Sequence, residues 1–139
     1  SKKLVLPIDV IAASSTTDKA KIRVAAPNDV HDDEFVLDIG PQTVLAFATQ
    51  IKRAQTIAWN GPLGLFEVKK FSHATIALGR IIAARSTGRA YGVVGGGETI
   101  AALEQTKMAE YVDHISTGGG AMLDFLTGET LPGIKPLLE

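Results

Sequence analysis

Two glycine-rich turns are the parts of this sequence whose residue types and spacing could do chemistry. Residues 93–99 read VVGGGET and residues 116–122 read STGGGAM. Glycines let a backbone approach a ligand closely, and the start of the next helix offers unpaired N–H groups and a positive dipole end. Two such turns predict two anion sites, which favours a site that handles phosphate. The alternative for the first turn is a tight bend in which Glu98 or Thr99 caps the helix.

A third polar turn follows another short apolar run. Residues 59–67 read WNGPLGLFE, with Asn60 and Gly61 directly after the apolar run. The carboxylate of Glu67 could accept hydrogen bonds from the hydroxyl groups of a sugar. The alternative is an Asx-type turn beside a core tryptophan, Trp59.

Several other kinds of site are excluded. A G-x-G-x-x-G/A dinucleotide fingerprint counted from Gly95 has Ile100 where glycine or alanine belongs, and no G-x-x-x-x-G-K-[ST] loop occurs. The acidic run at residues 32–34 lacks the glycine and the terminal glutamate of a calcium loop, so we expect a solvated loop there. The three histidines have no partner at metal-ligand spacing.

Composition indicates one soluble globular domain. The chain has 139 residues, of which 45% are hydrophobic and 21% charged, and its net charge is −1. A charge so close to neutral gives no indication of a nucleic-acid or membrane-surface partner. The absence of cysteine excludes disulfides and thiolate metal sites, and it suits a reducing, cytoplasmic compartment.

Apolar periodicity predicts alternating strands and helices. We expect strands at residues 4–13, 22–27, 35–40, 56–59, 91–94 and 114–116. We expect helices at residues 41–53, 70–85 and 98–108, then a last helix stopped by Gly128 and an extended tail. The alternation predicts βαβ units and a parallel sheet, with the three polar turns on the edge where ligands bind. Residues 4–13 should form a strand buried on both faces, so the chain is expected to be part of something longer.

Together the motifs resemble those of the phosphoglycerate kinase family. WNGPLGLFE, GGGET and HISTGGGAMLDFLTGETLPGI carry the resemblance, and LPIDVIAA and LDIGPQT match the carboxyl-terminal domain of that family in the same order. The resemblance implies an α/β fold, a Rossmann-like parallel three-layer sandwich that is incomplete. Residues 1–139 would be the second half of the nucleotide-binding domain of a two-domain kinase.

The resemblance also implies an activity. The family transfers a phosphoryl group between 1,3-bisphosphoglycerate and ADP to give 3-phosphoglycerate and ATP, with Mg²⁺ as cofactor. An intact member would be a glycolytic enzyme, monomeric and cytoplasmic, without nucleic-acid or membrane partners. A fragment would expose an open sheet edge, through which it could self-associate.

The resemblance assigns roles residue by residue. The implied nucleotide contacts are Leu37 at adenine, Glu67 at ribose, and Asn60, Gly95, Gly96, Gly97 and Thr99 along the phosphates. Glu98 would stand at the nucleotide and magnesium position. The implied catalytic groups are the backbone N–H groups of Gly118, Gly119 and Gly120, which would stabilise the phosphoryl in flight.

Two departures from the family pattern have consequences. The family has aspartate where this chain has Glu98, which is one methylene longer, so binding of Mg²⁺ directly or through a water stays open. The amino-terminal domain, with its basic substrate patch and catalytic arginine, and the first half of the carboxyl-terminal domain are absent. We therefore expect a fragment with negligible kinase activity alone; the alternatives are a non-catalytic adenine-nucleotide-binding module, an inert folded remnant and a generic dinucleotide binder.

Overall fold

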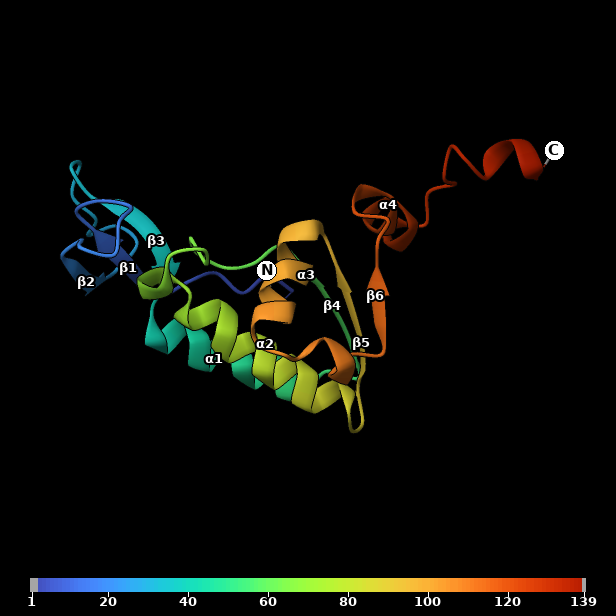
Figure 1. The fold of residues 1–139 in the computed structure, drawn as a ribbon, viewed down its shortest axis with the longest axis horizontal. Helices are drawn as coiled ribbons and strands as arrows, with labels where there is room; N and C mark the ends of the chain where they lie inside the picture. The colour runs from blue at the N-terminus through green and yellow to red at the C-terminus, as the bar shows by residue number, and fades with distance from the viewer. Residues whose placement is uncertain (1–2, 139) are drawn as a thin grey trace.

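Two three-stranded sheets connected by helices make up the fold. The computed structural model describes residues 3–138. Figure 1 shows an antiparallel sheet at one end, a parallel sheet further along, and two long helices side by side between them. None of the described helices is long and apolar enough to cross a membrane.

The antiparallel sheet contains the first three strands, in the order β2-β1-β3. They are β1 (Val10–Ala13), β2 (Ile22–Ala25) and β3 (Phe35–Ile39). The predicted alternation included the strand at residues 35–40, and its expected place in the parallel sheet is wrong, because β3 pairs with β1 and only loops connect these three strands. Antiparallel neighbours can be joined by a loop, whereas parallel ones need a crossover. The β2–β3 loop is held by Arg23, whose guanidinium donates to Glu34 at 2.7 and 2.8 Å and to Asp29 at 3.1 Å.

The predicted first strand is shorter and more exposed than expected. Its pairing starts only at Val10, while Leu4 and Leu6 are each 64% exposed. The prediction of a strand over residues 4–13 buried on both faces is therefore wrong. Pro7 has no N–H to donate to a ladder, and Asp9 is already engaged with a helix.

The parallel sheet has the order β4-β5-β6 and confirms the predicted α/β fold with a parallel sheet. Its strands are β4 (Thr56–Asn60), β5 (Tyr91–Gly95) and β6 (His114–Ser116). One face packs on helices through a core of Ile57, Trp59, Ile82, Ala90, Val94 and Leu103. Burial of these side chains is the main force that orders this half of the chain.

Four helices connect the strands or follow them. They are α1 (Pro41–Arg53), α2 (His73–Ser86), α3 (Gly97–Gln105) and α4 (Gly120–Thr127). In Figure 1, α3 and α4 lie on opposite sides of the parallel sheet. Short 3-10 helices occur at η1 (Lys69–Phe71), η2 (Ala109–Tyr111) and η3 (Lys135–Leu137), so the tail is not wholly extended as expected.

The predicted helix boundaries are confirmed for α1 and shift elsewhere. Pro41 is the first residue of α1, where its missing N–H costs nothing. The helix expected over residues 70–85 is divided at Ser72 into η1 and α2. The helix expected to reach residue 108 ends at Gln105, because Lys107 has a φ of 55°, outside the right-handed helical range.

A distant carboxylate caps α1. Asp9 accepts hydrogen bonds from the backbone N–H of Gln42 at 3.0 Å and of Thr43 at 2.7 Å. The Thr43 hydroxyl lies 2.6 Å from the same carboxylate. Burial would raise the pKa of Asp9, but these hydrogen bonds outweigh it and lower the pKa below its ordinary value. A Cβ on Gly40 would lie 2.2 Å from Cγ of Asp9, so only glycine fits there.

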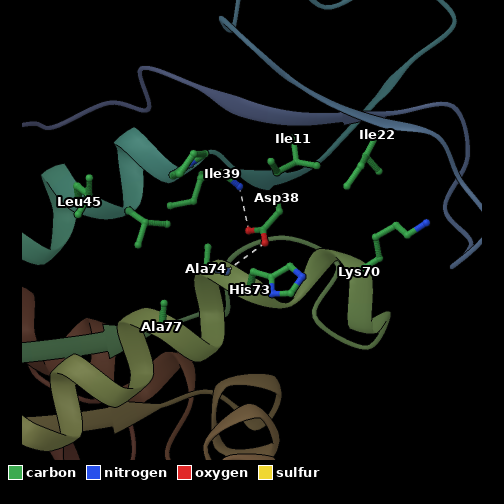
Figure 2. A pocket seen from close by; sticks show the side chains of 11 residues that line it. Ile11, Ile22, Asp38, Ile39, Leu45, Lys70, His73, Ala74 and Ala77 are labelled. Carbon is green, nitrogen blue, oxygen red and sulfur yellow. Dashed lines mark hydrogen bonds between the residues drawn. The ribbon is translucent and has the colours of Figure 1, made fainter.

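A second buried carboxylate holds the start of α2. Asp38 on β3 accepts from the backbone N–H of Ala74 at 3.1 Å and from its own neighbour Ile39 at 2.9 Å. Figure 2 shows both bonds on the wall of an apolar pocket between the antiparallel sheet and the two long helices. Burial raises the pKa of Asp38 to about 6, against the lowering effect of the two N–H groups and of His73.

Candidate functional site

The three polar turns lie at one edge of the parallel sheet, as predicted. In the strand register Asn60 pairs with Gly95, and Gly95 pairs with Ser116. The last residues of β4, β5 and β6 are therefore level, and the three turns leave the sheet side by side. This is the carboxyl-end edge at which parallel α/β sheets bind their ligands.

The first glycine turn contains two glycines that the fold itself requires. A Cβ on Gly95 would lie 2.5 Å from Cε of Met122, which packs over the strand end. Gly96 has a φ of 88°, and a Cβ there would lie 2.7 Å from Oδ1 of Asn60. Both positions need glycine for packing or for backbone geometry. Gly97, by contrast, opens α3 with no atom near the place of a Cβ, which leaves room for a ligand.

The alternative in which Glu98 or Thr99 caps α3 is wrong. Gly96 is the N-cap residue, and no side chain makes a capping hydrogen bond there. Glu98 is exposed on the first turn of the helix, and its side chain makes no hydrogen bond within the described residues 3–138. The first N–H groups of α3 thus remain available to an anion.

The second glycine turn is open to solvent. The backbone N–H of Gly118 donates to the Ser116 hydroxyl at 3.3 Å. Gly119 has a φ of 47° and is the N-cap of α4, which begins at Gly120. No atom lies near the place of a Cβ on Gly119 or Gly120, so a ligand could approach this backbone closely.

The third turn, residues 61–67, is here called the site loop. It starts beside Trp59, a core residue whose indole N–H donates to the carbonyl of Gly61 at 2.8 Å. Glu67 at its end and Asn60 just before it are exposed. Leu37 lies next to the loop, because its carbonyl accepts from the N–H of Leu65 at 2.8 Å. The structure therefore places Leu37, on β3, beside the loop that joins Asn60 to Glu67.

Thr99 is placed differently from the other predicted site residues. It is fully buried, and its hydroxyl accepts from the N–H of Gly61 at 2.6 Å. The side chain therefore joins the first glycine turn to the site loop within the protein. A contact of Thr99 with nucleotide phosphates stays a prediction for its backbone N–H.

No complete metal site is built from side chains within residues 3–138, where no three histidine or acidic residues gather. Mg²⁺ often takes one or two carboxylates, several waters and phosphate oxygens of its substrate. The exposed carboxylate of Glu98, beside the open backbone of Gly97, fits such a partial ligand set.

Sequence reasoning missed three buried polar residues that hold the start of α1, the start of α2 and the site loop. They are Asp9, Asp38 and Thr75, which are 5%, 3% and 2% exposed. The sequence signal for the two aspartates was a charge within an otherwise apolar run. Thr75 lies on a helix in a pattern that gives no such signal.

Comparison with known proteins identifies the family. Residues 1–129 match the model of the phosphoglycerate kinase family. The chain belongs to this family. A phosphoglycerate kinase structure from Coxiella burnetii is 42% identical with a TM-score of 0.86, over 95% of this chain and 33% of that one. The phosphoglycerate kinase of Pyrococcus horikoshii OT3 is 30% identical with a TM-score of 0.74, over 95% and 32%.

The predicted resemblance to the phosphoglycerate kinase family is thereby confirmed. The chain spans about a third of the length of these two structures. It is a partial domain relative to them, in agreement with the incomplete Rossmann-like fold that the sequence predicts.

Proposed function

We propose that this chain is the nucleotide-holding second half of the carboxyl-terminal domain of a phosphoglycerate kinase. In the whole enzyme it would bind ADP or ATP while a phosphoryl group passes between 1,3-bisphosphoglycerate and ADP. The observation that carries the proposal is the level register of Asn60, Gly95 and Ser116, which gathers three family motifs at one sheet edge.

Each turn would have a separate task. The first turns of α3 and α4 would direct backbone N–H groups toward negative charge, the former at the nucleotide phosphates and the latter at the transferring phosphoryl. Exposed Glu67 would accept hydrogen bonds from ribose hydroxyls. Mg²⁺ would neutralise phosphate charge in this reaction class. Glu98 is the residue that would hold it, directly or through water.

The first prediction is that the chain alone binds Mg·ADP but has negligible kinase activity. The resemblance implies that the family's basic patch and catalytic arginine lie outside residues 1–139, so these residues alone would lack much of the charge stabilisation of the transition state. Calorimetric titration with Mg·ADP measures binding, and a coupled ATP-formation assay measures turnover. Turnover near that of a full-length kinase would contradict this prediction, and no heat at millimolar Mg·ADP would leave an inert remnant.

The second prediction concerns Glu98. In the intact enzyme Glu98→Ala should lower the magnesium-dependent turnover by about 10-fold or more, because a carboxylate that binds the metal or its water is lost. Glu98→Asp should be tolerated, because it keeps a hard oxygen donor.

The matched control for Glu98 is Glu104→Ala, which removes an exposed carboxylate from the last turn of the same helix. It should leave the magnesium dependence unchanged. The metal role of Glu98 would be wrong if Glu98→Ala and Glu104→Ala gave the same magnesium titration.

A further inference from the structure

The site loop is held at three alternate residues by three different elements. Gly61 is held by the Thr99 hydroxyl of α3, and Leu65 donates to the carbonyl of Leu37 on β3. Between them, Leu63 donates its N–H to the Thr75 hydroxyl of α2 at 2.8 Å. The three hydrogen bonds lie between Asn60 and Glu67, the proposed phosphate and ribose residues.

The attachment at Leu63 differs from the others in that one side chain, that of Thr75, makes two hydrogen bonds to it. Besides accepting from the N–H of Leu63, the Thr75 hydroxyl donates to its carbonyl. One buried side chain therefore satisfies both backbone groups of one loop residue. A loop residue held in this way cannot rotate its peptide planes without breaking two hydrogen bonds.

The helix turn that contains Thr75 is attached to β3. It follows Ala74, whose N–H is bound by the Asp38 carboxylate. The loop also passes close to β3 here, because a Cβ on Gly64 would lie 2.5 Å from the Leu37 carbonyl and 2.8 Å from Asp38 Oδ1. Gly64 has a φ of 67°, which glycine adopts without strain.

We infer that Thr75 is a positioning residue for nucleotide binding: its hydroxyl, bonded to both backbone groups of Leu63, sets the span from Asn60 to Glu67. The inference rests on the proposed function, because it assigns a role to a buried residue behind that site. Thr75 does not touch the nucleotide. It acts by keeping the phosphate and ribose residues at a fixed separation before the ligand arrives.

The test compares Thr75→Val with Thr75→Ser. Valine keeps the shape of threonine but has no hydroxyl, whereas serine keeps the hydroxyl and loses a methyl. Thr75→Val should weaken Mg·ADP binding by this chain about 10-fold and speed hydrogen exchange at the Leu63 amide. Thr75→Ser should restore the binding and the slow exchange, although it creates a small gap in the core. If Thr75 acted only through packing, Thr75→Val, which keeps the shape of threonine, would bind Mg·ADP like the wild type, and Thr75→Ser, which leaves the gap, would bind more weakly.

Ser86→Ala is the matched control. Ser86 is another buried hydroxyl on α2, and it donates to the carbonyl of Ile82 at 2.9 Å, far along the helix from the loop. Its loss should leave Leu63 exchange and Mg·ADP binding unchanged. Exchange at the amides of β5 reports whether any variant has lost global stability.

The outcomes separate this inference from the proposed function. If the wild type binds Mg·ADP and Thr75→Val binds it equally well, the inference is overturned and the proposed function stands. The same holds if hydrogen exchange at the Leu63 amide is unchanged in Thr75→Val. Weakened binding that Thr75→Ser fails to restore would also overturn it. If the wild type gave no heat with Mg·ADP while Leu63 exchange still depended on the hydroxyl, the proposed function would fail and the positioning role would fail with it.

Discussion

Replacing Asp9 by alanine should lower the free energy of unfolding by about 3 kcal/mol, one of the two largest effects expected for this chain. The buried carboxylate accepts from the N–H groups of Gln42 and Thr43 and lies 2.6 Å from the Thr43 hydroxyl. Alanine would leave these groups unpaired and would remove a negative charge from the N-terminus of α1. Urea unfolding followed by the fluorescence of Trp59, the single tryptophan, measures the change.

Two variants control this experiment. Asp9→Asn keeps one acceptor oxygen and should cost less, so it remains measurable if the alanine variant does not fold. Asp33→Ala removes an exposed carboxylate from the β2–β3 loop and should have little effect. Equal losses for Asp9→Ala and Asp33→Ala would contradict the capping role.

The pH dependence of the Asp9 contribution follows from its lowered pKa. A carboxylate whose pKa is lower in the folded than in the unfolded chain stabilises the fold above its ordinary pKa. That contribution is lost as the pH falls through the folded value. Glu34 behaves in the same sense, since the Arg23 hydrogen bonds and the His31 N–H lower its pKa to about 2.

Asp38 should give the opposite pH dependence, and this is the second large effect. Burial raises its pKa to about 6 from the ordinary 3.8, so between these values the folded chain holds a proton that the unfolded chain has lost. The free energy of unfolding should therefore fall by about 3 kcal/mol as the pH rises from 4 to 7. Urea midpoints across this range measure it, and Asp38→Asn should flatten the curve.

A histidine control is needed for Asp38. Lys70 and His73 are the other charged or titratable residues that line the same pocket. The charge of His73 acts on the Asp38 pKa, so His73→Gln separates the two groups. The curve should keep most of its slope in His73→Gln. A slope that survives Asp38→Asn and disappears in His73→Gln would assign the effect to the imidazole.

Local patterns were sufficient to predict much of the parallel half of the chain. Pro41 after Gly40 predicted where α1 begins, and short apolar runs before glycines predicted β4 and β5. These signals are local, because helix starts and buried strands depend on residues within a few positions of one another. The same alternation of strands, polar turns and helices predicted that the three turns would share one edge of the sheet.

The antiparallel half was not predicted, because strand pairing is not a local property. The run at residues 4–13 is apolar enough for a buried strand, yet pairing begins at Val10 and Leu4 stays exposed. The signal for antiparallel neighbours is that the loops between β1, β2 and β3 contain no helix. Strand propensity takes no account of the length or content of these loops.

The sequence by itself determined the family, the order of strands and helices around the parallel sheet, and the three turns at its edge. Only the tertiary structure decided which buried polar side chains hold the start of α1 and two of those turns. The bonds of Asp9 to Thr43, Thr99 to Gly61 and Thr75 to Leu63 join residues 34, 38 and 12 positions apart. Hydrogen bonds of this kind form only after packing has brought distant segments together and excluded water, so no local pattern records them.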